Sequence, residues 1–474
     1  MVWRVIQFAY MHNHPTVFVL LGAAGDLAQR KLLPALFDLY VQGELPKQFC
    51  LLGSGRREFD DQGYKNFVVS VLQDQRPQAD QAMVDGFEAQ VQYEQGDFND
   101  AALYQSLYRR VHEFNESIGQ CANVLFYLAV PPSLYSTMFH QLAENKSLDI
   151  CAGTGAWARL LVEKPFGNDV KTAYALEEQL CGSFADEQIY RIDHYLAKTA
   201  VENITTLRFG NSILQKVWDA ECIESIDVTL HESIGIEGRG AFYEGVGALR
   251  DVGQNHLLQI ISLLLMKRVN LQDAEAVREE RARVVDSLRF DSTHRPPVRG
   301  QYDGYLAENG VSPESQTETY FSCSLASVAP EWIGVPITVS VGKALPELHH
   351  EAVITFRSTN VQQSGILYDG DTHTNQLRIR LAPEQKMSLT LLTRSSGRTM
   401  EAVSSEYQLV RPELSQPDGV DAYERVLLDG IRGNQSRFVS SAEVLAAWRL
   451  VEIIRSELLA RPLVTYQPGT APTE

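Results

Sequence analysis

With 474 residues, 44% of them hydrophobic, the chain is long enough for two or three domains of roughly 150 residues each. Its formal net charge of −18 disfavours nucleic acid and anionic membranes as partners, and no apolar run approaches the roughly 20 residues of a membrane span. The six cysteines are scattered without close pairs, which disfavours a zinc site or a disulfide framework and is typical of a reducing cytoplasm.

The first part of the chain alternates strand-like and helix-like segments. Residues 1–15 hold a short mixed apolar patch, which we expect to be a flexible extension rather than a signal peptide. Helical patterns at 64–73 and 101–114 separate short apolar runs that stop at glycine or proline, as buried parallel strands do. These runs are TVFVLLG (16–22), QFCLLGSG (48–55), NVLFYLAVPP (123–132) and ARLLVEKPFG (158–167). The alternation predicts a doubly wound α/β domain of the Rossmann type over residues 1–195.

The pattern changes after about residue 205. Polar and apolar residues now alternate within short segments, which is typical of an antiparallel sheet with one covered face. Such segments are ESIDVTLHES (224–233), AVITFRS (352–358), NQLRIRLAP (375–383) and KMSLTLLTR (386–394). Helical stretches at 251–268 and 441–460 are interspersed. We therefore predict a larger α+β domain over residues 196–474.

A glycine-rich loop follows the first predicted strand. Gly22, Gly25 and Ala28 have the spacing G-x-x-G-x-x-A, a variant of the dinucleotide fingerprint. Small residues let the backbone approach a pyrophosphate at a helix N-terminus. The loop expected to bind the cofactor comprises Gly22, Ala23, Ala24, Gly25, Asp26 and Leu27. The alternative interpretation is a tight strand-to-helix turn without a ligand.

The end of the second predicted strand indicates which cofactor is bound. NAD sites place an acidic residue here to bind the ribose 2′-hydroxyl, whereas this chain has Arg56 and Arg57. Guanidinium groups match a phosphate in geometry and charge, so the pair favours NADP. Alternatively the arginines are solvated, and one of them pairs with Glu58.

Two histidine-containing stretches carry candidate chemistry. In RIDHYLAK (191–198), His194 and Lys198 would share one face of a helix, where two cations repel unless an anion lies between them. His256 lies in an apolar run, where a histidine is more often a core residue than a catalytic base. A base of this kind needs a carboxylate to orient it, and Asp193 is a candidate, although the sequence leaves the histidine–aspartate pairing open.

The ordered set of motifs resembles the glucose-6-phosphate dehydrogenase family over essentially the whole chain. The matching segments are GAAGDLAQRKLLPALF, FYLAVPP, EKPFG, RIDHYLAK, EGRG, GALRDVGQNHLLQ, VRGQY, GVP with GK after it, and DAYERVLLDGIRG. The resemblance implies a Rossmann-like domain, a second domain with a large antiparallel sheet, and a homodimer or homotetramer, for which the cysteine pattern predicts a cytoplasmic location. It also implies oxidation of glucose 6-phosphate to 6-phosphogluconolactone, with NADP and without a metal.

The resemblance also assigns roles to individual residues. His256 matches the general base and Asp193 the carboxylate that supports it. His194, Tyr195, Lys198 and Lys343 match groups that bind the sugar phosphate. The remaining matches are Lys164 at the junction of substrate and nicotinamide, Lys31 on the substrate side, and Glu232 and Asp251 at sugar hydroxyls. Pro165 matches a proline that is cis in the family.

The chain departs from the family pattern at several positions. Ala197 and Thr199 replace Gly and Glu of the usual YLGKE, and Ser340 and Leu348 stand where the family usually has basic residues. The neighbouring His349 and His350 could partly replace the missing charge. These departures keep two alternatives open: a dehydrogenase of a different sugar phosphate, and a non-catalytic cofactor-binding relative with a regulatory role.

Overall fold

The computed structural model describes residues 14–145, 153, 155–358, 367–368, 373–394, 401–409 and 422–472. The chain forms two compact units. The first comprises Met1–Ala197, Leu271–Arg278 and Val420–Ser441, and the second comprises Lys198–Asn270, Glu279–Gly419 and Ala442–Glu474. The sequence pattern had placed 271–278 and 420–441 with the second domain. Of the expected N-terminal extension, residues 1–13 lie outside the described residues.

A seven-stranded sheet forms the centre of the first unit, in the order β17-β6-β5-β4-β1-β2-β3. Its strands are β1 (Thr16–Leu21), β2 (Phe49–Gly55), β3 (Val91–Gln95), β4 (Asn123–Leu128), β5 (Ala158–Val162), β6 (Ile189–Ile192) and β17 (Phe438–Val439). Neighbouring strands from β6 to β3 pair in parallel, whereas β17 is antiparallel to β6. Because β1 is the starting point for winding in both directions, the sheet has the doubly wound order predicted from the sequence.

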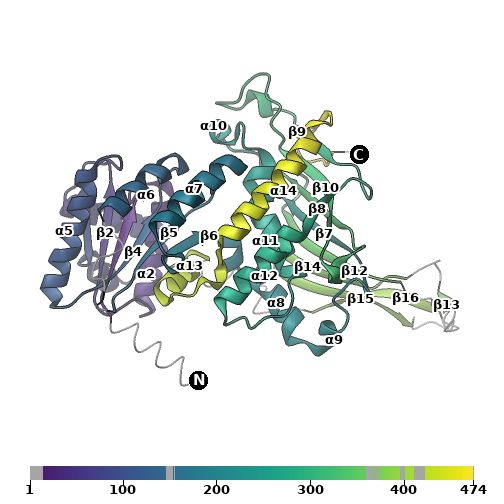
Figure 1. The fold of residues 1–474 in the computed structure, drawn as a ribbon, viewed down its shortest axis with the longest axis horizontal. Helices are drawn as coiled ribbons and strands as arrows, with labels where there is room; N and C mark the ends of the chain where they lie inside the picture. Colours follow the sequence, from purple (N-terminus) through teal and green to yellow (C-terminus); the bar gives the residue numbers. More distant parts are fainter. Residues whose placement is uncertain are drawn as a thin grey trace. The chain divides into compact units, whose positions relative to one another are not determined.

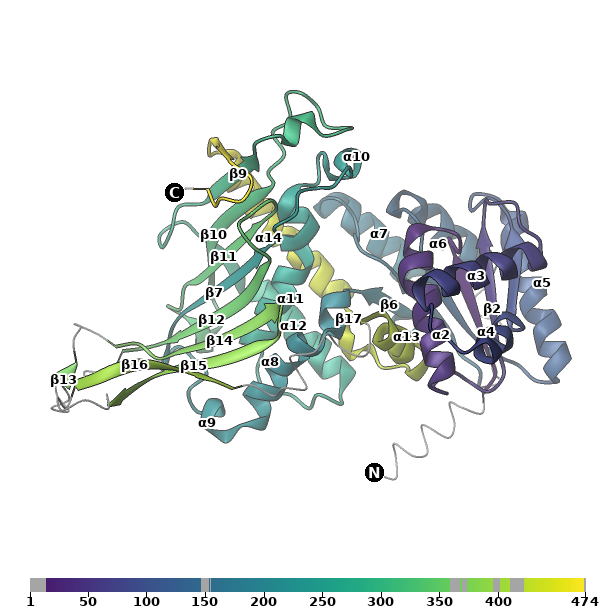
Figure 2. The ribbon, with the colours of Figure 1, turned by 180° about the vertical axis from the view of Figure 1, so that it is seen from behind.

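Helices cover both faces of this sheet. Figure 1 shows α5 (Ala101–Ile118), α6 (Tyr135–Glu144) and α7 (Val170–Ser183) on one face. Figure 2, from behind, shows α2 (Leu33–Val41), α3 (Asp61–Gln75) and α4 (Gln81–Glu88) on the other. The other helical elements of this unit are η1 (Ala28–Leu32), η2 (Pro132–Leu134), η3 (Asp186–Gln188), η4 (His194–Ala197), α13 (Ala422–Arg432) and η10 (Gln435–Arg437). Aspartate side chains accept backbone N–H groups at four helix starts, which fixes where these helices begin: Asp60, Asp80, Asp100 and Asp169.

The second unit contains an eleven-stranded sheet in the order β13-β16-β15-β14-β12-β7-β11-β10-β9-β18, with β8 pairing to β10. Its strands are β7 (Ile223–His231), β8 (Leu288–Asp291), β9 (Val298–Tyr302), β10 (Tyr320–Ser327), β11 (Ile337–Gly342), β12 (His349–Phe356), β13 (Leu367–Tyr368), β14 (Gln376–Ala382), β15 (Lys386–Arg394), β16 (Glu401–Gln408) and β18 (Leu463–Tyr466). Most pairs are antiparallel, and β7 with β11 is a parallel exception. The large antiparallel sheet implied by the resemblance is therefore present.

Helices of the second unit lie against one face of its sheet. In Figure 1 the helices α11 (Leu258–Leu265), α12 (Ala274–Ser287) and α14 (Ser441–Leu459) lie in front of the strands, and in Figure 2 the strands lie in front. The other helical elements are α8 (Thr199–Gly210), α9 (Ser212–Gln215), α10 (Gly240–Tyr243), η5 (Leu249–Leu257), η6 (Tyr305–Ala307) and η7 (Pro330–Trp332). All eight residues of α11 are buried, which explains why six of them are leucine or isoleucine.

The structure bears on the expectations about membrane spans and disulfide bonds. None of the helices in the described parts of the chain combines the length and apolar character of a membrane-crossing segment. Cys50, Cys181, Cys222 and Cys323 are free thiols, whereas Cys121 is disulfide-bonded. The wide spacing of the cysteines did not predict that bond.

Candidate active site

Several candidate residues of the first unit lie at one edge of its sheet. Gly22, Arg56 and Asp193 directly follow β1, β2 and β6, and Lys164 is the second residue after β5. Because these strands are parallel, their carboxyl ends share one edge, where doubly wound sheets bind ligands. In the β5–β6 register Val162 pairs with Arg191, so Lys164 and Asp193 are each two residues beyond that pair.

The glycine loop lies at the point where the strand order reverses. Gly22 has φ +93°, and a Cβ on this residue would lie 2.2 Å from the carbonyl oxygen of Ala129, which follows β4. The Gly25 N–H donates to the Gly22 carbonyl over 2.9 Å, closing the turn before the helix that carries the exposed Lys31. A tight turn of small residues leading into a helix N-terminus fits a dinucleotide pyrophosphate.

The two arginines after β2 are exposed, as a phosphate-binding pair must be. The Arg57 guanidinium lies 5.3 Å from the ring centroid of Phe59, which supports its position. The pKa of Asp97 is lowered, mainly by hydrogen bonds from Asn99. The positive charge of Arg56 is the smallest cause of this shift. Among the ion pairs of the described residues, none joins Glu58 to either arginine.

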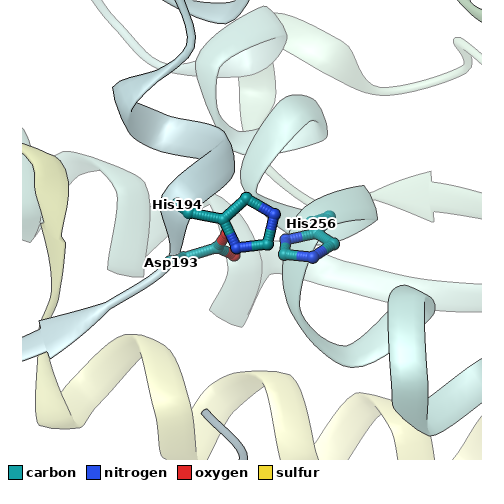
Figure 3. Close-up of side chains that lie close together, drawn as sticks. All are labelled: Asp193, His194 and His256. Carbon is teal, nitrogen blue, oxygen red and sulfur yellow. The ribbon is translucent and has the colours of Figure 1, made fainter. Parts of the chain in front are cut away.

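The RIDHYLAK stretch is not a single helix. His194–Ala197 form a 3₁₀ turn (η4), and Lys198 is extended, with φ −76° and ψ 130°, as the N-cap of α8. The buried Asp193 accepts the Tyr195 N–H over 3.0 Å, which starts the turn immediately after β6. The prediction that His194 and Lys198 share one helix face is therefore wrong. Figure 3 shows the side chains of Asp193 and His194 on adjacent residues after that strand.

Helix α13 supports this turn with residues to which the sequence analysis gave no role. The Tyr423 ring stacks on His194 with centroids 6.1 Å apart and an interplanar angle of 18°. The Arg425 guanidinium donates to the Ala197 carbonyl over 2.9 Å. Both residues lie in the DAYERVLLDGIRG segment, so the motif pointed to the region without indicating what it contacts.

In the second unit, Asp251 and His256 lie on η5, a nine-residue π-helical segment. The His256 side chain, also drawn in Figure 3, belongs to a residue only 4% exposed. Its backbone N–H donates to Asn255 Oδ1 over 2.7 Å, and Asn255 Nδ2 donates to the Asp251 carbonyl over 3.0 Å. π-Helical turns are rare and occur frequently at functional sites.

Two acidic candidates of this unit cluster around the buried Lys343. Lys343 Nζ lies 2.6 Å from Glu232 Oε2 and 3.6 Å from Asp251 Oδ2, and its side chain is 5% exposed. The same ammonium group lies 5.5 Å from the ring centroid of Tyr243. The structure thus brings a predicted phosphate ligand together with the two acids predicted to bind sugar hydroxyls.

Comparison with known proteins decides the family. Residues 19–203 match the family model described as glucose-6-phosphate dehydrogenase, NAD binding domain, and residues 205–474 match the model of the C-terminal domain. The chain belongs to the glucose-6-phosphate dehydrogenase family. The first unit therefore contains a nicotinamide dinucleotide-binding domain, and the fold class predicted from the sequence is confirmed.

Relatives within the family are similar over almost their full length. The glucose-6-phosphate 1-dehydrogenase of Aggregatibacter actinomycetemcomitans is 35% identical, over 95% of this chain and 93% of its own. A solved structure titled as glucose-6-phosphate dehydrogenase in complex with its substrate glucose-6-phosphate is 32% identical, with a TM-score of 0.87 and coverage of 98% and 96%. The Mycobacterium avium glucose-6-phosphate 1-dehydrogenase structure is 30% identical, with a TM-score of 0.80 and coverage of 96% and 95%.

Ser340, one of the departures from the family pattern, contacts a histidine. The Ser340 hydroxyl lies 2.6 Å from Nε2 of His231, a residue that the sequence analysis did not single out. Burial lowers the pKa of His231 to about 4, with a smaller contribution from His349, so this histidine is neutral near pH 7. The neutral pair does not restore the positive charge absent at position 340.

The expectation that His350 supplies the missing charge is wrong. Burial lowers its pKa to about 3, and the charge of Lys198 is the next largest cause, followed by smaller contributions that include Lys343. Both lysines therefore act electrostatically on the same buried imidazole. His349 lies 3.5 Å from a Glu351 oxygen, whereas Leu348 is 37% exposed beside it.

Proposed function

We propose that this chain oxidises glucose 6-phosphate at C1 to 6-phosphogluconolactone, with NADP as the hydride acceptor. The observation that carries the proposal is the match of both family domains over residues 19–474, by a chain that keeps the expected site residues. A binding module has little use for a general base, so His256 argues against the non-catalytic alternative.

In the proposed reaction His256 removes the C1 hydroxyl proton. Its imidazole must be neutral for this step, and Asp193 stabilises the imidazolium that forms. The bound nicotinamide supplies the electrophile that receives the hydride. The hydrogen-bonded backbone around both residues, on η5 and directly after β6, supports these roles because a base must be held in a fixed orientation.

Substrate binding is proposed to use both charge and hydrogen bonding. Lys198, His194 and Tyr195 bind the 6-phosphate, while Glu232 and Asp251 accept hydrogen bonds from sugar hydroxyls. The buried Lys343 neutralises these acids and holds their carboxylates in place, so its role includes orientation as well as direct attraction of the phosphate. The remaining proposed contacts are Lys164, at the junction of substrate and nicotinamide, and Lys31.

NADP is the proposed cofactor because of the charge after β2. The exposed Arg56 and Arg57 stand where an NAD-specific domain has an acid, and their guanidinium groups suit a 2′-phosphate. We also propose a homodimer or homotetramer in the cytoplasm.

A spectrophotometric assay tests the proposal. Purified protein is mixed with glucose 6-phosphate and either NADP or NAD, and the reduced nicotinamide is followed by its absorbance. We expect turnover with NADP, with a lower kcat/KM for NAD and no comparable activity with unphosphorylated glucose. Activity only with another sugar phosphate would support the alternative substrate, and no reduction with any of them would support a regulatory relative.

A further inference from the structure

Glu163 is an acid of the EKPFG motif to which neither the sequence analysis nor the proposed mechanism gives a role. It directly follows β5, at the ligand-binding edge of the sheet, and precedes the cis peptide bond between Lys164 and Pro165. The cis form matches the expectation from the resemblance. The Glu163 side chain is partly buried.

Side chains from several elements of the first unit face Glu163. The Tyr127 hydroxyl on β4 donates to Glu163 Oε1 over 2.5 Å, and the Tyr135 hydroxyl on α6 donates to the Glu163 carbonyl over 2.8 Å. Tyr423 on α13 interacts electrostatically with Tyr127. The charged groups acting on the carboxyl are Lys164, which follows it, and Asp193, which follows the neighbouring strand β6. Two groups of the proposed reaction, of opposite charge, thus act electrostatically on Glu163.

We propose that Glu163 is a positioning residue whose carboxylate, held by Tyr127, attracts the Lys164 ammonium and fixes it at the sheet edge, and that protonation of Glu163 weakens this hold. The inference rests on the proposed function, in which Lys164 lies where substrate and nicotinamide meet.

The electrostatics of the site support a change of charge under ordinary conditions. Removal from water raises the pKa of Glu163 to about 7, against the opposing effects of the Tyr127 hydrogen bond and Lys164, while Asp193 adds a smaller increase. Above this pH the carboxylate attracts Lys164, and below it the neutral acid does not. Glutamine keeps the acceptor for Tyr127 but cannot ionise, so it mimics the protonated state.

The test compares the pH dependence of kcat/KM for glucose 6-phosphate in wild type and Glu163→Gln, from pH 5.5 to 9. The ratio of the two kcat/KM values cancels the titration of His256, because both proteins contain this residue. We expect the variant to be about three- to tenfold less active than wild type at pH 8.5, the range for losing one partly exposed charge-assisted contact. The two proteins should differ less than twofold at pH 5.5.

Two tyrosine variants provide matched comparisons. Tyr127→Phe removes a hydrogen bond that lowers the pKa of Glu163. When its kcat/KM is divided by that of Glu163→Gln and plotted against pH, the inflection should therefore lie at a higher pH than for wild type. Tyr135→Phe removes a bond to the backbone carbonyl only, so it should leave the inflection in place. Infrared spectroscopy should show a protonated carboxyl band that disappears as the pH rises through about 7, and that is missing in Glu163→Gln.

The outcomes are distinguishable. An inactive wild type would overturn the proposed function, and this inference with it. If wild type is active but the ratio of its kcat/KM to that of Glu163→Gln does not change with pH, the inference alone is overturned. A purely structural role of Glu163 would give a loss of kcat/KM that is the same at every pH. Absence of the infrared band, or an equal shift in both tyrosine variants, would also overturn it.

Discussion

Replacing Gly22 with alanine should destabilise the first unit and impair cofactor binding. Gly22 has φ +93°, a conformation that costs an L-residue about 1–2 kcal/mol. The new Cβ would also lie 2.2 Å from the Ala129 oxygen, whereas ordinary van der Waals contact begins at 3.4 Å. The loop after β1 and the end of β4 must therefore separate by roughly 1 Å, and overpacking of this kind costs about 1–3 kcal/mol.

The two costs sum to about 2–5 kcal/mol in the free energy of unfolding. Gly119→Ala is the matched control, because Gly119 has φ +68° but a Cβ on this residue would meet nothing within 4 Å. It should lose only the backbone cost of about 1–2 kcal/mol. Urea unfolding measures both losses, and titration with NADP measures cofactor affinity.

Gly22→Ala should also weaken NADP binding by tenfold or more, because the displaced segment is the loop proposed to hold the pyrophosphate, whereas Gly119→Ala should not. Equal losses of stability in the two variants would refute the steric part of this reasoning. Unchanged NADP affinity in Gly22→Ala would refute the assignment of the loop.

Four further predictions concern the proposed base, the two arginines after β2, and positions 348 and 350. His256→Asn should lower kcat by about 10²–10⁴ with little change in KM, and near-normal kcat at saturating substrate would make His256 a core residue. Replacing both Arg56 and Arg57 with alanine should raise the KM for NADP about tenfold or more, because charge-assisted hydrogen bonds to the 2′-phosphate are lost. The KM for NAD should rise much less. Equal effects on the two KM values would contradict the assignment of these arginines to the 2′-phosphate. Leu348→Lys should lower the KM for glucose 6-phosphate without raising kcat, as shown by saturation curves, and an unchanged KM would place position 348 away from the phosphate. The pKa of His350 is about 3 in the folded state and about 6.5 when unfolded, so the unfolded chain binds more protons between these values and stability falls as the pH drops through them. His350→Gln should therefore reduce the pH dependence of the unfolding free energy by up to about 1.4 kcal/mol per pH unit between pH 4 and 6, as measured by urea unfolding.

The sequence predicted the elements whose patterns are local. The apolar runs at 16–22 and 123–132 became β1 and β4, and the alternating segment at 386–394 became β15. Both kinds of segment have a period and a length that identify a strand without knowledge of its neighbours. The family, the fold class and the cis state of Pro165 were also predicted, because the motifs themselves were specific.

What the sequence did not predict depends on tertiary contacts. The turn at Asp193 looked like part of a helix, because the hydrogen bond from the Tyr195 N–H that forms the turn has no periodic signature. His350 looked like a reserve of positive charge, because its burial depends on strands distant in sequence. The Lys343 cluster joins this lysine to two acids that lie more than 90 positions earlier in the chain, and no spacing rule brings Glu232 to the end of β11.

The antiparallel strand β17 has a consequence for biosynthesis. It covers the outer edge of β6, and α13 beside it adds Val426, Leu427 and Ile431 to the core of the first unit. A ribosome that has made only the first 200 residues has therefore produced a domain with an exposed strand edge and an incomplete core, both of which favour aggregation. Synthesis must continue to about residue 439 before this nucleotide-binding unit can close. The unfinished unit therefore keeps this exposed edge while almost the whole second unit is translated.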